Sequence, residues 1–301
     1  MERTDDEIPS FTISEQEAAR GALDEATIQG ACAAFRESGA IRLHRAVPLG
    51  MHAELDGHYR RRYARELAGT TKADLRPLFT VDVEGPFNRP AFYANPLVYP
   101  IIARLLGSDC ILGACSSVVS FPGAPAQFTH RDSESLYGDY TFDVGLPPYA
   151  LTVLLPLVDA NEETGSTEVW PASHKEPSLE KVCARPPLHP LVPKGSVMLT
   201  DSRVVHRGAA NRSSATIRPI VYCSYHRHWF RDYGGYEHRP PIAMSPLDFS
   251  KVPPEHRHLF DWRFDRYWKI RVRRQAERVA RDLFPERVIE GARAAWRRLR
   301  G

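Results

Sequence analysis

The 301-residue sequence lacks several features that mark other classes of protein. Its five cysteines are an odd number and form no CxxC pair, so a disulfide framework is not expected and reduced thiols are favoured. No apolar run reaches the roughly eighteen residues that a membrane span needs. The first ten residues are polar and contain no apolar core, so we expect no signal peptide and a cytoplasmic location.

A strong excess of charge is also missing. The formal net charge is only +3 and no recognition motif occurs, so nucleic acid is not an expected partner. Basic residues gather in the last forty positions, where an apolar stripe at helical spacing predicts basic C-terminal helices. We expect these helices to pack on the core or to pair in a homodimer, with an anionic membrane or polymer as the alternative.

A single domain is predicted over 1–301, with a mainly helical part at 1–108. Amphipathic patterns predict helices at 14–38, 49–69 and 93–108. The first of these begins at a capping-box spacing, Ser14 with Glu17, and Gly39 and Gly107 follow the first and third.

The amino-acid pattern changes over residues 109–230. Short runs rich in Val, Leu, Ile, Thr and aromatics alternate there with Gly, Pro and Asn, which predicts an antiparallel sandwich or barrel. The predicted strands lie within 110–121, 149–159, 166–173, 195–205 and 218–229. Two irregular segments, 133–149 and 231–249, are rich in Gly, Pro and Tyr, and we expect them to be lids. The rest of 231–301 is predicted to hold the basic helices.

The segment "AQFTHRDSES" places His130 and Asp132 two residues apart. Such a triplet is a weak signal alone, because it often arises by chance. At a strand end, however, both side chains lie on the same side of the sheet. Non-haem Fe(II) is held by two imidazoles and one carboxylate on one face. A third ligand must then come from a distant strand that is adjacent in space.

His206 meets this requirement, since it follows an apolar run 74 residues beyond Asp132. Arg218 begins the next run, after the turn-rich "GAANRSSAT", and we expect the strands of His206 and Arg218 to pair as a hairpin. A guanidinium near a metal can bind the far carboxylate of a dicarboxylic acid through two parallel hydrogen bonds.

Together these features resemble the phytanoyl-CoA dioxygenase family of Fe(II)- and 2-oxoglutarate-dependent oxygenases. The resemblance covers roughly residues 30–230 and includes "FTHRD", "DANEETGSTEVWPASHK", His206 and Arg218. It implies a mainly β fold with flanking helices, built on a double-stranded β-helix (jelly-roll, cupin-like) core. It also implies that His130, Asp132 and His206 bind Fe(II) and that Arg218 binds 2-oxoglutarate. O2 would be the second co-substrate, with ascorbate in a supporting role.

Three positions depart from the family pattern. Ala172 replaces a glycine found in many members. A leucine, near Leu154, replaces a tryptophan that many members have on the strand after the HxD motif. Gly208 replaces a serine that binds 2-oxoglutarate in some members. None of these changes affects the predicted iron ligands. They leave undetermined which residues besides Arg218 contact 2-oxoglutarate. Related halogenases have Gly or Ala at the position of Asp132, so halogenation is disfavoured.

Weaker candidates surround the motif. Gln127 and Thr152 are predicted to contact 2-oxoglutarate, with ordinary strand-end polar roles as the alternative. Predicted substrate contacts are Arg131, Tyr137, Tyr149 and Trp229. His226 and His228 lie on one face of a predicted strand and suggest a second metal site. Without a third ligand, a surface or substrate-facing strand is the better interpretation.

The predicted function is hydroxylation of an unactivated C–H bond in a small organic molecule, with secondary-metabolite tailoring favoured by analogy to the family. One alternative is desaturation, epoxidation or ring rearrangement with the same cofactors. Another is a cupin-like metal-binding barrel that is non-catalytic or uses no 2-oxoglutarate.

Overall fold

The computed structural model describes residues 8–68, 75–232 and 240–264. The chain separates into two compact units, 1–260 and 261–301, and the site discussed below lies wholly in the first. The predicted basic helices and the homodimer that they would form lie outside the described residues, beyond Phe264. Within the described ranges, no helix combines the length and the apolar character needed to cross a membrane.

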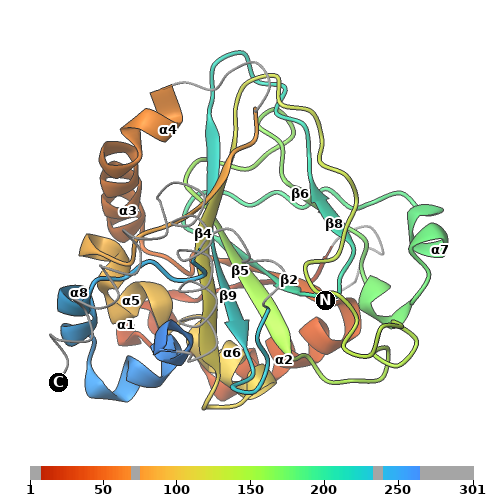
Figure 1. Cartoon of the computed structure of the whole chain (residues 1–301), viewed down its shortest axis with the longest axis horizontal. Coiled ribbons are helices and arrows are strands. Elements are labelled where there is room, and N and C mark those ends of the chain that lie inside the picture. The colour runs from red at the N-terminus through yellow and green to blue at the C-terminus, as the bar shows by residue number, and fades with distance from the viewer. Residues whose placement is uncertain (1–7, 69–74, 233–239, 265–301) are drawn as a thin grey trace, which may run out of the picture. The chain divides into compact units, whose positions relative to one another are not determined.

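Seven strands form one mixed sheet in the order β1-β2-β7-β5-β9-β4-β3 (Figure 1). All neighbours run antiparallel except β1 and β2, which are parallel. The bounds of these strands are β1 Ser10–Thr12, β2 Ala40–His44, β3 Leu78–Thr80, β4 Ile111–Ser120, β5 Ala150–Pro156, β7 Val197–Asp201 and β9 Arg218–His226. A second, two-stranded sheet pairs β6 (Thr167–Val169) with β8 (His206–Gly208).

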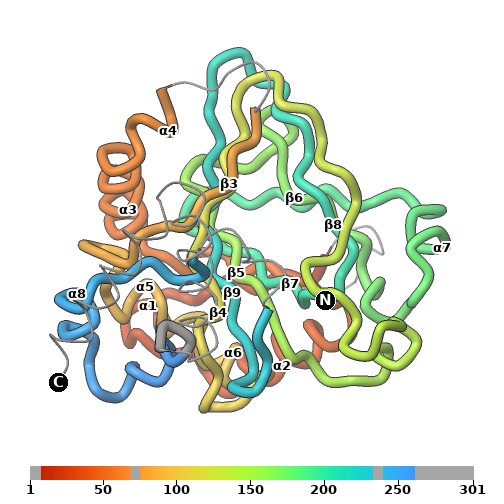
Figure 2. The backbone as a smooth tube through the Cα atoms, viewed as in Figure 1, coloured from red at the N-terminus to blue at the C-terminus, as the bar shows by residue number. Residues whose placement is uncertain are grey.

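The two faces of the large sheet have different neighbours. Helices cover one face, and β6 and β8 lie across from the other (Figures 1 and 2). Strand β9 shows why: Val221, Cys223 and Tyr225 join the main hydrophobic core with helix residues. The alternate residues, such as Tyr222 and Ser224, line a cavity on the opposite face. The predicted double-stranded β-helix core with flanking helices is thus confirmed.

The N-terminal part is mainly helical, and its first predicted helix is two helices. The capping box of Ser14 and Glu17 is present, but Gly21 ends α1 in the left-handed region at φ 65°. Gly39 ends α2 in the same way at φ 73°. The helices of this part are α1 Glu15–Arg20, α2 Glu25–Ser38, α3 Leu49–Arg62, α4 Ala64–Ala68, α5 Pro90–Tyr93 and α6 Tyr99–Leu106, with the 3₁₀ helix η1 at Gly85–Asn88.

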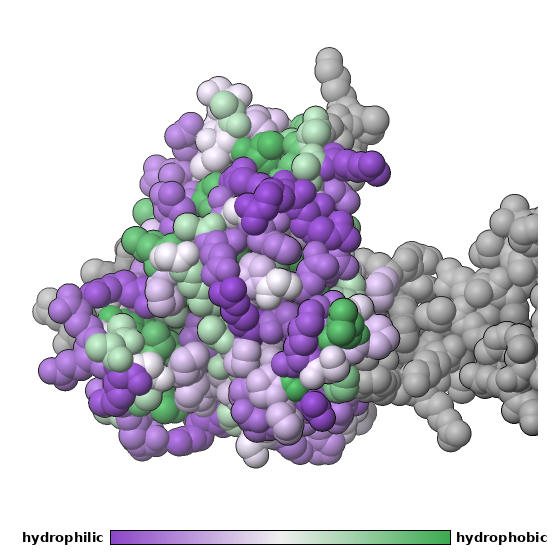
Figure 3. Space-filling view, turned by 90° about the vertical axis from the view of Figure 1, so that its left-hand side faces the viewer, coloured by the Kyte–Doolittle hydropathy of each residue, from purple (hydrophilic) through white to green (hydrophobic). Residues whose placement is uncertain are grey.

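The remaining helices are short: η2 Ser173–Lys175, α7 Leu179–Cys183, α8 Pro246–Ser250 and η3 Pro254–Phe264. The longer α3 buries one side, where Leu55 and Tyr59 join the core and the Nε2 of His52 lies 2.9 Å from the carbonyl oxygen of Pro156 at the end of β5. Its last turn is basic. The outer face on this side is largely hydrophilic, with small apolar patches (Figure 3).

The expected hairpin between the strands of His206 and Arg218 is wrong. Strand β8 pairs with β6, whereas β9 pairs with β4 and β5 in the large sheet. The connecting loop crosses between the sheets, and Asn211 holds it by donating to the carbonyls of Ser120 and Thr216. His206 and Arg218 therefore face one cavity from opposite walls.

Candidate active site

Two imidazoles and one carboxylate converge at one edge of the cavity between the sheets. The ligand atoms of His130, Asp132 and His206 all lie within 4.8 Å of one another. The same oxygen, Oδ1 of Asp132, lies 3.8 Å from Nε2 of His130 and 3.5 Å from Nε2 of His206. The backbones of His130 and His206 exchange two hydrogen bonds as an isolated β-bridge, and the centroids of the two rings lie 4.5 Å apart.

Both imidazoles are held in the tautomer that a metal requires. Nδ1 of His130 lies 3.0 Å from the carbonyl oxygen of Phe128, and Nδ1 of His206 lies 3.0 Å from that of Val204. A carbonyl only accepts, so each Nδ1 carries a proton, and in the neutral ring Nε2 then keeps the lone pair that binds a metal. Burial, followed by the neighbouring His206, lowers the pKa of His130 and favours its neutral form. The set therefore fits the two-histidine, one-carboxylate arrangement of non-haem iron.

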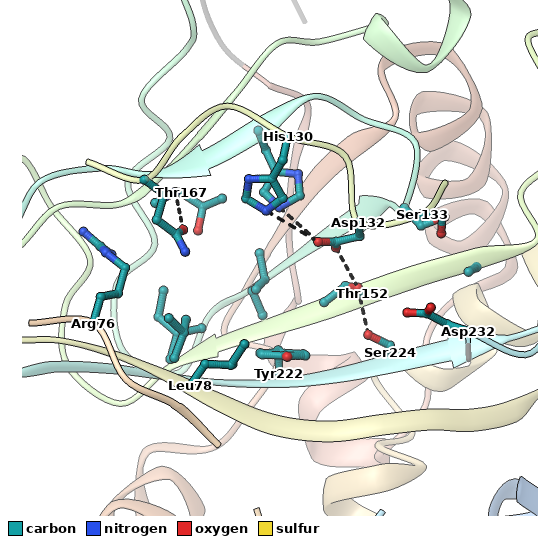
Figure 4. Close-up of a pocket in the computed structure, with 18 of the residues that line it drawn as sticks. Arg76, Leu78, His130, Asp132, Ser133, Thr152, Thr167, Tyr222, Ser224 and Asp232 are labelled. Carbon is teal, nitrogen blue, oxygen red and sulfur yellow. Dashed lines mark hydrogen bonds and ion pairs between the residues drawn. The ribbon is translucent and has the colours of Figure 1, made fainter. Parts of the chain in front are cut away.

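The carboxylate of Asp132 is fixed from behind. Thr152 on β5 donates to Oδ2 of Asp132 at 3.4 Å, and its hydroxyl lies 3.0 Å from that of Ser224 on β9 (Figure 4). The pairing of Thr152 with Ser224 across the two strands sets this contact. Oδ1 is thus left facing the imidazoles.

The cavity beside these residues has a volume of about 280 Å³, and a guanidinium is buried at one end of it. Arg218 at the start of β9 donates from Nε to the carbonyl of Thr164 at 2.9 Å and is only 1% exposed. Among the described residues, no carboxylate forms an ion pair with Arg218. Burial, followed by repulsion from Arg76, lowers the pKa of Arg218 to about 9.

Arg76 is a second guanidinium at this end, and the sequence patterns did not single it out. It donates to the carbonyls of Pro125 and Ala209 at 2.6 and 2.9 Å, and burial lowers its pKa to about 10. It precedes β3, an edge strand of three residues, which is too short to show a periodic pattern. Two desolvated cations near each other favour an anionic ligand between them.

Gly208 lies on the cavity wall at the position where the resembling family has a serine in some members, and other side chains fill the space that the serine would take. A Cβ at Gly208 would lie 2.6 Å from Oε1 of Gln127 and 2.8 Å from Nη1 of Arg76. Gln127 instead accepts a hydrogen bond from the Gly208 amide at 2.8 Å. The missing side chain therefore makes room for Gln127 and Arg76, and both line the cavity.

The sequence matches the family model described as phytanoyl-CoA dioxygenase (PhyH) over residues 20–220. The chain belongs to the phytanoyl-CoA dioxygenase family. It is 27% identical to dioxygenase trt7 of Aspergillus terreus, over 53% of this chain and 58% of that protein. Dioxygenase aneA of Aspergillus aculeatus is 26% identical, over 60% of this chain and 64% of that protein. The chain thus spans less than two thirds of the length of these relatives.

Solved structures agree on the fold. The non-haem, α-ketoglutarate-dependent epimerase SnoN from nogalamycin biosynthesis superposes with a TM-score of 0.54 at 20% identity, over 70% of this chain and 88% of that one. SnoN in complex with Fe³⁺, α-ketoglutarate and nogalamycin RO gives a TM-score of 0.53. The likeness to these structures shows a shared fold, and the family model shows the family of the chain.

The weaker candidates divide into three groups. Gln127 and Thr152 line the cavity as expected of co-substrate contacts, although the Thr152 hydroxyl points at Asp132. Arg131 is bound by four backbone carbonyls and lies over the ring of Tyr140, which makes it part of the wall of a neighbouring hollow. Three predicted substrate contacts line neither space: Tyr137, Tyr149 and Trp229.

The first predicted lid borders a second hollow of about 640 Å³ that opens next to the cavity. Ser133 to Leu136 line it together with Phe230 and Leu179. Asp132, Ser133 and Asp232 line both spaces. The hollow therefore leads directly to the predicted iron ligands, and we call it the vestibule. Part of the second predicted lid, 233–239, lies outside the described residues.

A buried ion pair fastens the first predicted lid, 133–149, to the loop that leads to His206. Arg203 binds both oxygens of Asp201 at 2.9 and 2.8 Å, and its Nη1 donates to the carbonyls of Asp143 and Leu146 in the lid. The side chains of Arg203 and Asp201 are only 2% and 1% exposed.

Replacing Arg203 with methionine is expected to lower the free energy of unfolding by about 3–5 kcal/mol, because Asp201 is left buried without its partner. Equilibrium denaturation in urea measures this change. The matched control is Arg60→Met, which removes an exposed pair with Asp56 on α3 and should cost less than about 1 kcal/mol. Equal losses in the two variants would contradict the assignment of Arg203 as the lid anchor.

Proposed function

We propose that this protein is an iron- and 2-oxoglutarate-dependent oxygenase that hydroxylates an unactivated C–H bond of a small organic molecule, with 2-oxoglutarate and O2 as co-substrates. His130, Asp132 and His206 are the proposed iron ligands, and Arg218, supported by Arg76, is the proposed site for the far carboxylate of 2-oxoglutarate. The observation that carries this proposal is the convergence of the three ligand atoms within 4.8 Å at the edge of one cavity with a buried guanidinium.

Different residues have different proposed roles in the reaction. The two imidazoles and Asp132 would hold the iron at the edge of the cavity, and the cavity would receive the two substrates. Thr152 holds the carboxylate so that it stays oriented. Arg218 orients 2-oxoglutarate, and the walls of the cavity exclude water from the reacting C–H bond. When bound, iron supplies the redox chemistry: substrate, 2-oxoglutarate and O2 become alcohol, succinate and CO2.

Succinate formation tests the proposal. Purified protein supplied anaerobically with Fe(II), 2-oxoglutarate and ascorbate, and then with air, should release succinate above a metal-free control, because slow turnover occurs without the primary substrate. Ascorbate serves only to keep iron ferrous. A protein that binds neither Fe(II) nor 2-oxoglutarate, and releases no succinate with any substrate, would instead be the non-catalytic barrel.

The outcome of the reaction is the finer part of the proposal. A fold shared with an epimerase does not select hydroxylation, since one fold hosts several chemistries. Product mass decides: hydroxylation adds one oxygen, desaturation removes two hydrogens, and epimerisation leaves the mass unchanged. A role in secondary metabolism is supported by the nogalamycin pathway of SnoN. A cytoplasmic location stays a prediction.

A further inference from the structure

His226 lies at the end of the cavity that is remote from Arg218. Five alternate residues of β9 line the cavity: Arg218, Ile220, Tyr222, Ser224 and His226. Ser224 lies at the same position along the cavity as Asp132, because the hydroxyl of Thr152 contacts both residues. At about 3.4 Å per residue, His226 lies about 7 Å beyond Ser224, whereas Arg218 lies about 20 Å away in the other direction. Asp232 lies at the same end as Ser224, opposite Arg76 (Figure 4).

The fold makes a dedicated space for the His226 ring. The register of β4 against β9 shifts between Leu112 and Ala114, so Gly113 is the extra residue of a bulge. A Cβ at Gly113 would lie 2.2 to 2.4 Å from three atoms of the His226 ring. Phe230 closes the other side with an edge contact at 5.1 Å between centroids. The bulge and its glycine thus set the position of an imidazole on the cavity wall.

The chemistry of this imidazole selects the kind of group that it can bind. Burial, followed by the nearby Arg231, lowers the pKa of His226 to about 3, so the ring is neutral. A neutral imidazole offers one donor and one acceptor nitrogen. Arg231 near the ring and Asp232 on the cavity wall carry opposite charges, so this end favours neither a cationic nor an anionic group. An uncharged oxygen is the best match.

The adjoining vestibule indicates the rest of the molecule. Apolar and charged side chains line it together: Leu136, Leu179 and Phe230 with Arg131, Asp132, Glu134, Arg231 and Asp232. This mixed lining admits a neutral molecule that has both apolar and polar parts. Resting on the proposed function of the cavity, we propose that His226 is a specificity-determining residue that hydrogen-bonds a hydroxyl or carbonyl oxygen of a neutral primary substrate.

Matched small probes test this assignment on the full chain loaded with Mn(II) and 2-oxoglutarate. The probes are 1-indanone and 1-indanol, with indane as the analogue without oxygen and indane-1-carboxylate as the anion. Ligand-observed NMR titration should show the two neutral oxygen compounds binding about tenfold more tightly than indane. His226→Leu should abolish this preference, and His226→Gln should keep part of it.

A second pair of variants leaves His226 in place. Gly113→Ala should reduce the preference as His226→Leu does, because the new methyl group displaces the ring. Gly50→Ala has open space around it and should change nothing. The inference is overturned if indane or the carboxylate binds wild type as well as the neutral oxygen compounds, if none of the probes binds, or if His226→Leu keeps the preference.

The same samples separate this inference from the proposed function. Mn(II) and 2-oxoglutarate binding are titrated first, and thermal unfolding checks that each variant is folded. Loss of both bindings in wild type overturns the proposed function and this inference with it. Retained binding without a probe preference overturns only the role of His226.

Discussion

Replacing Asp132 with alanine is expected to lower Fe(II) affinity and succinate release by more than about 100-fold. Removing a group that merely orients a metal ligand typically costs about 10- to 100-fold, so loss of the charged ligand itself should cost more. Two neutral imidazoles would remain, with no negative charge to balance the metal. Anaerobic calorimetric titration with Fe(II), with Mn(II) as a redox-stable check, measures the affinity, and succinate release measures the activity.

Two control variants show whether the effect belongs to the site. Thr152→Val removes the hydroxyl that donates to Asp132 and should give the smaller loss of about 10- to 100-fold. Asp56→Ala removes a half-buried carboxylate that pairs with Arg60 on α3, away from the cavity, and should leave metal affinity unchanged. Full Fe(II) affinity in the Asp132 variant would mean that the metal, if bound, lies elsewhere.

The candidate ligands could be chosen from the sequence because local geometry carries most of the information. The spacing of His130 and Asp132 puts both on one side of an extended segment, and an apolar run before His206 predicts a strand that ends there. The structure brings all three together. The β runs also contain enough Val, Ile and aromatic residues to predict the main strands, including β4, β5 and β9.

Long-range pairing could not be predicted in the same way. The turn-rich loop before Arg218 has the composition of a hairpin, but the chain uses it to cross from the small sheet to the large one. Which strands pair depends on packing between distant segments, and no local pattern reports it. Arg76 was missed for the same reason, because only the pairing of the short β3 with β4 brings it to the cavity.

Replacing Arg218 with alanine is expected to weaken 2-oxoglutarate binding by about 3–5 kcal/mol, because the far carboxylate would lose its buried charged partner. This corresponds to a factor of about 100 to 4,000 in Kd. Anaerobic titration of the Mn(II)-loaded protein measures the change. Arg218→Lys keeps the charge without the planar fork and should fall between wild type and alanine.

A truncated ligand makes the Arg218 experiment specific. 2-Oxopentanoate keeps the 2-oxo acid that faces the metal and has a methyl group where 2-oxoglutarate has its far carboxylate. Wild type should prefer 2-oxoglutarate strongly, and Arg218→Ala should bind both compounds about equally.

Arg76→Met should lose a smaller part of the preference, because Arg218 remains in place and is freed from the repulsion that lowers its pKa. If Arg218→Ala weakened both ligands equally, the guanidinium would be maintaining the fold of the cavity and the far carboxylate would bind elsewhere. Unchanged affinity for 2-oxoglutarate would leave Arg218 with no part in co-substrate binding.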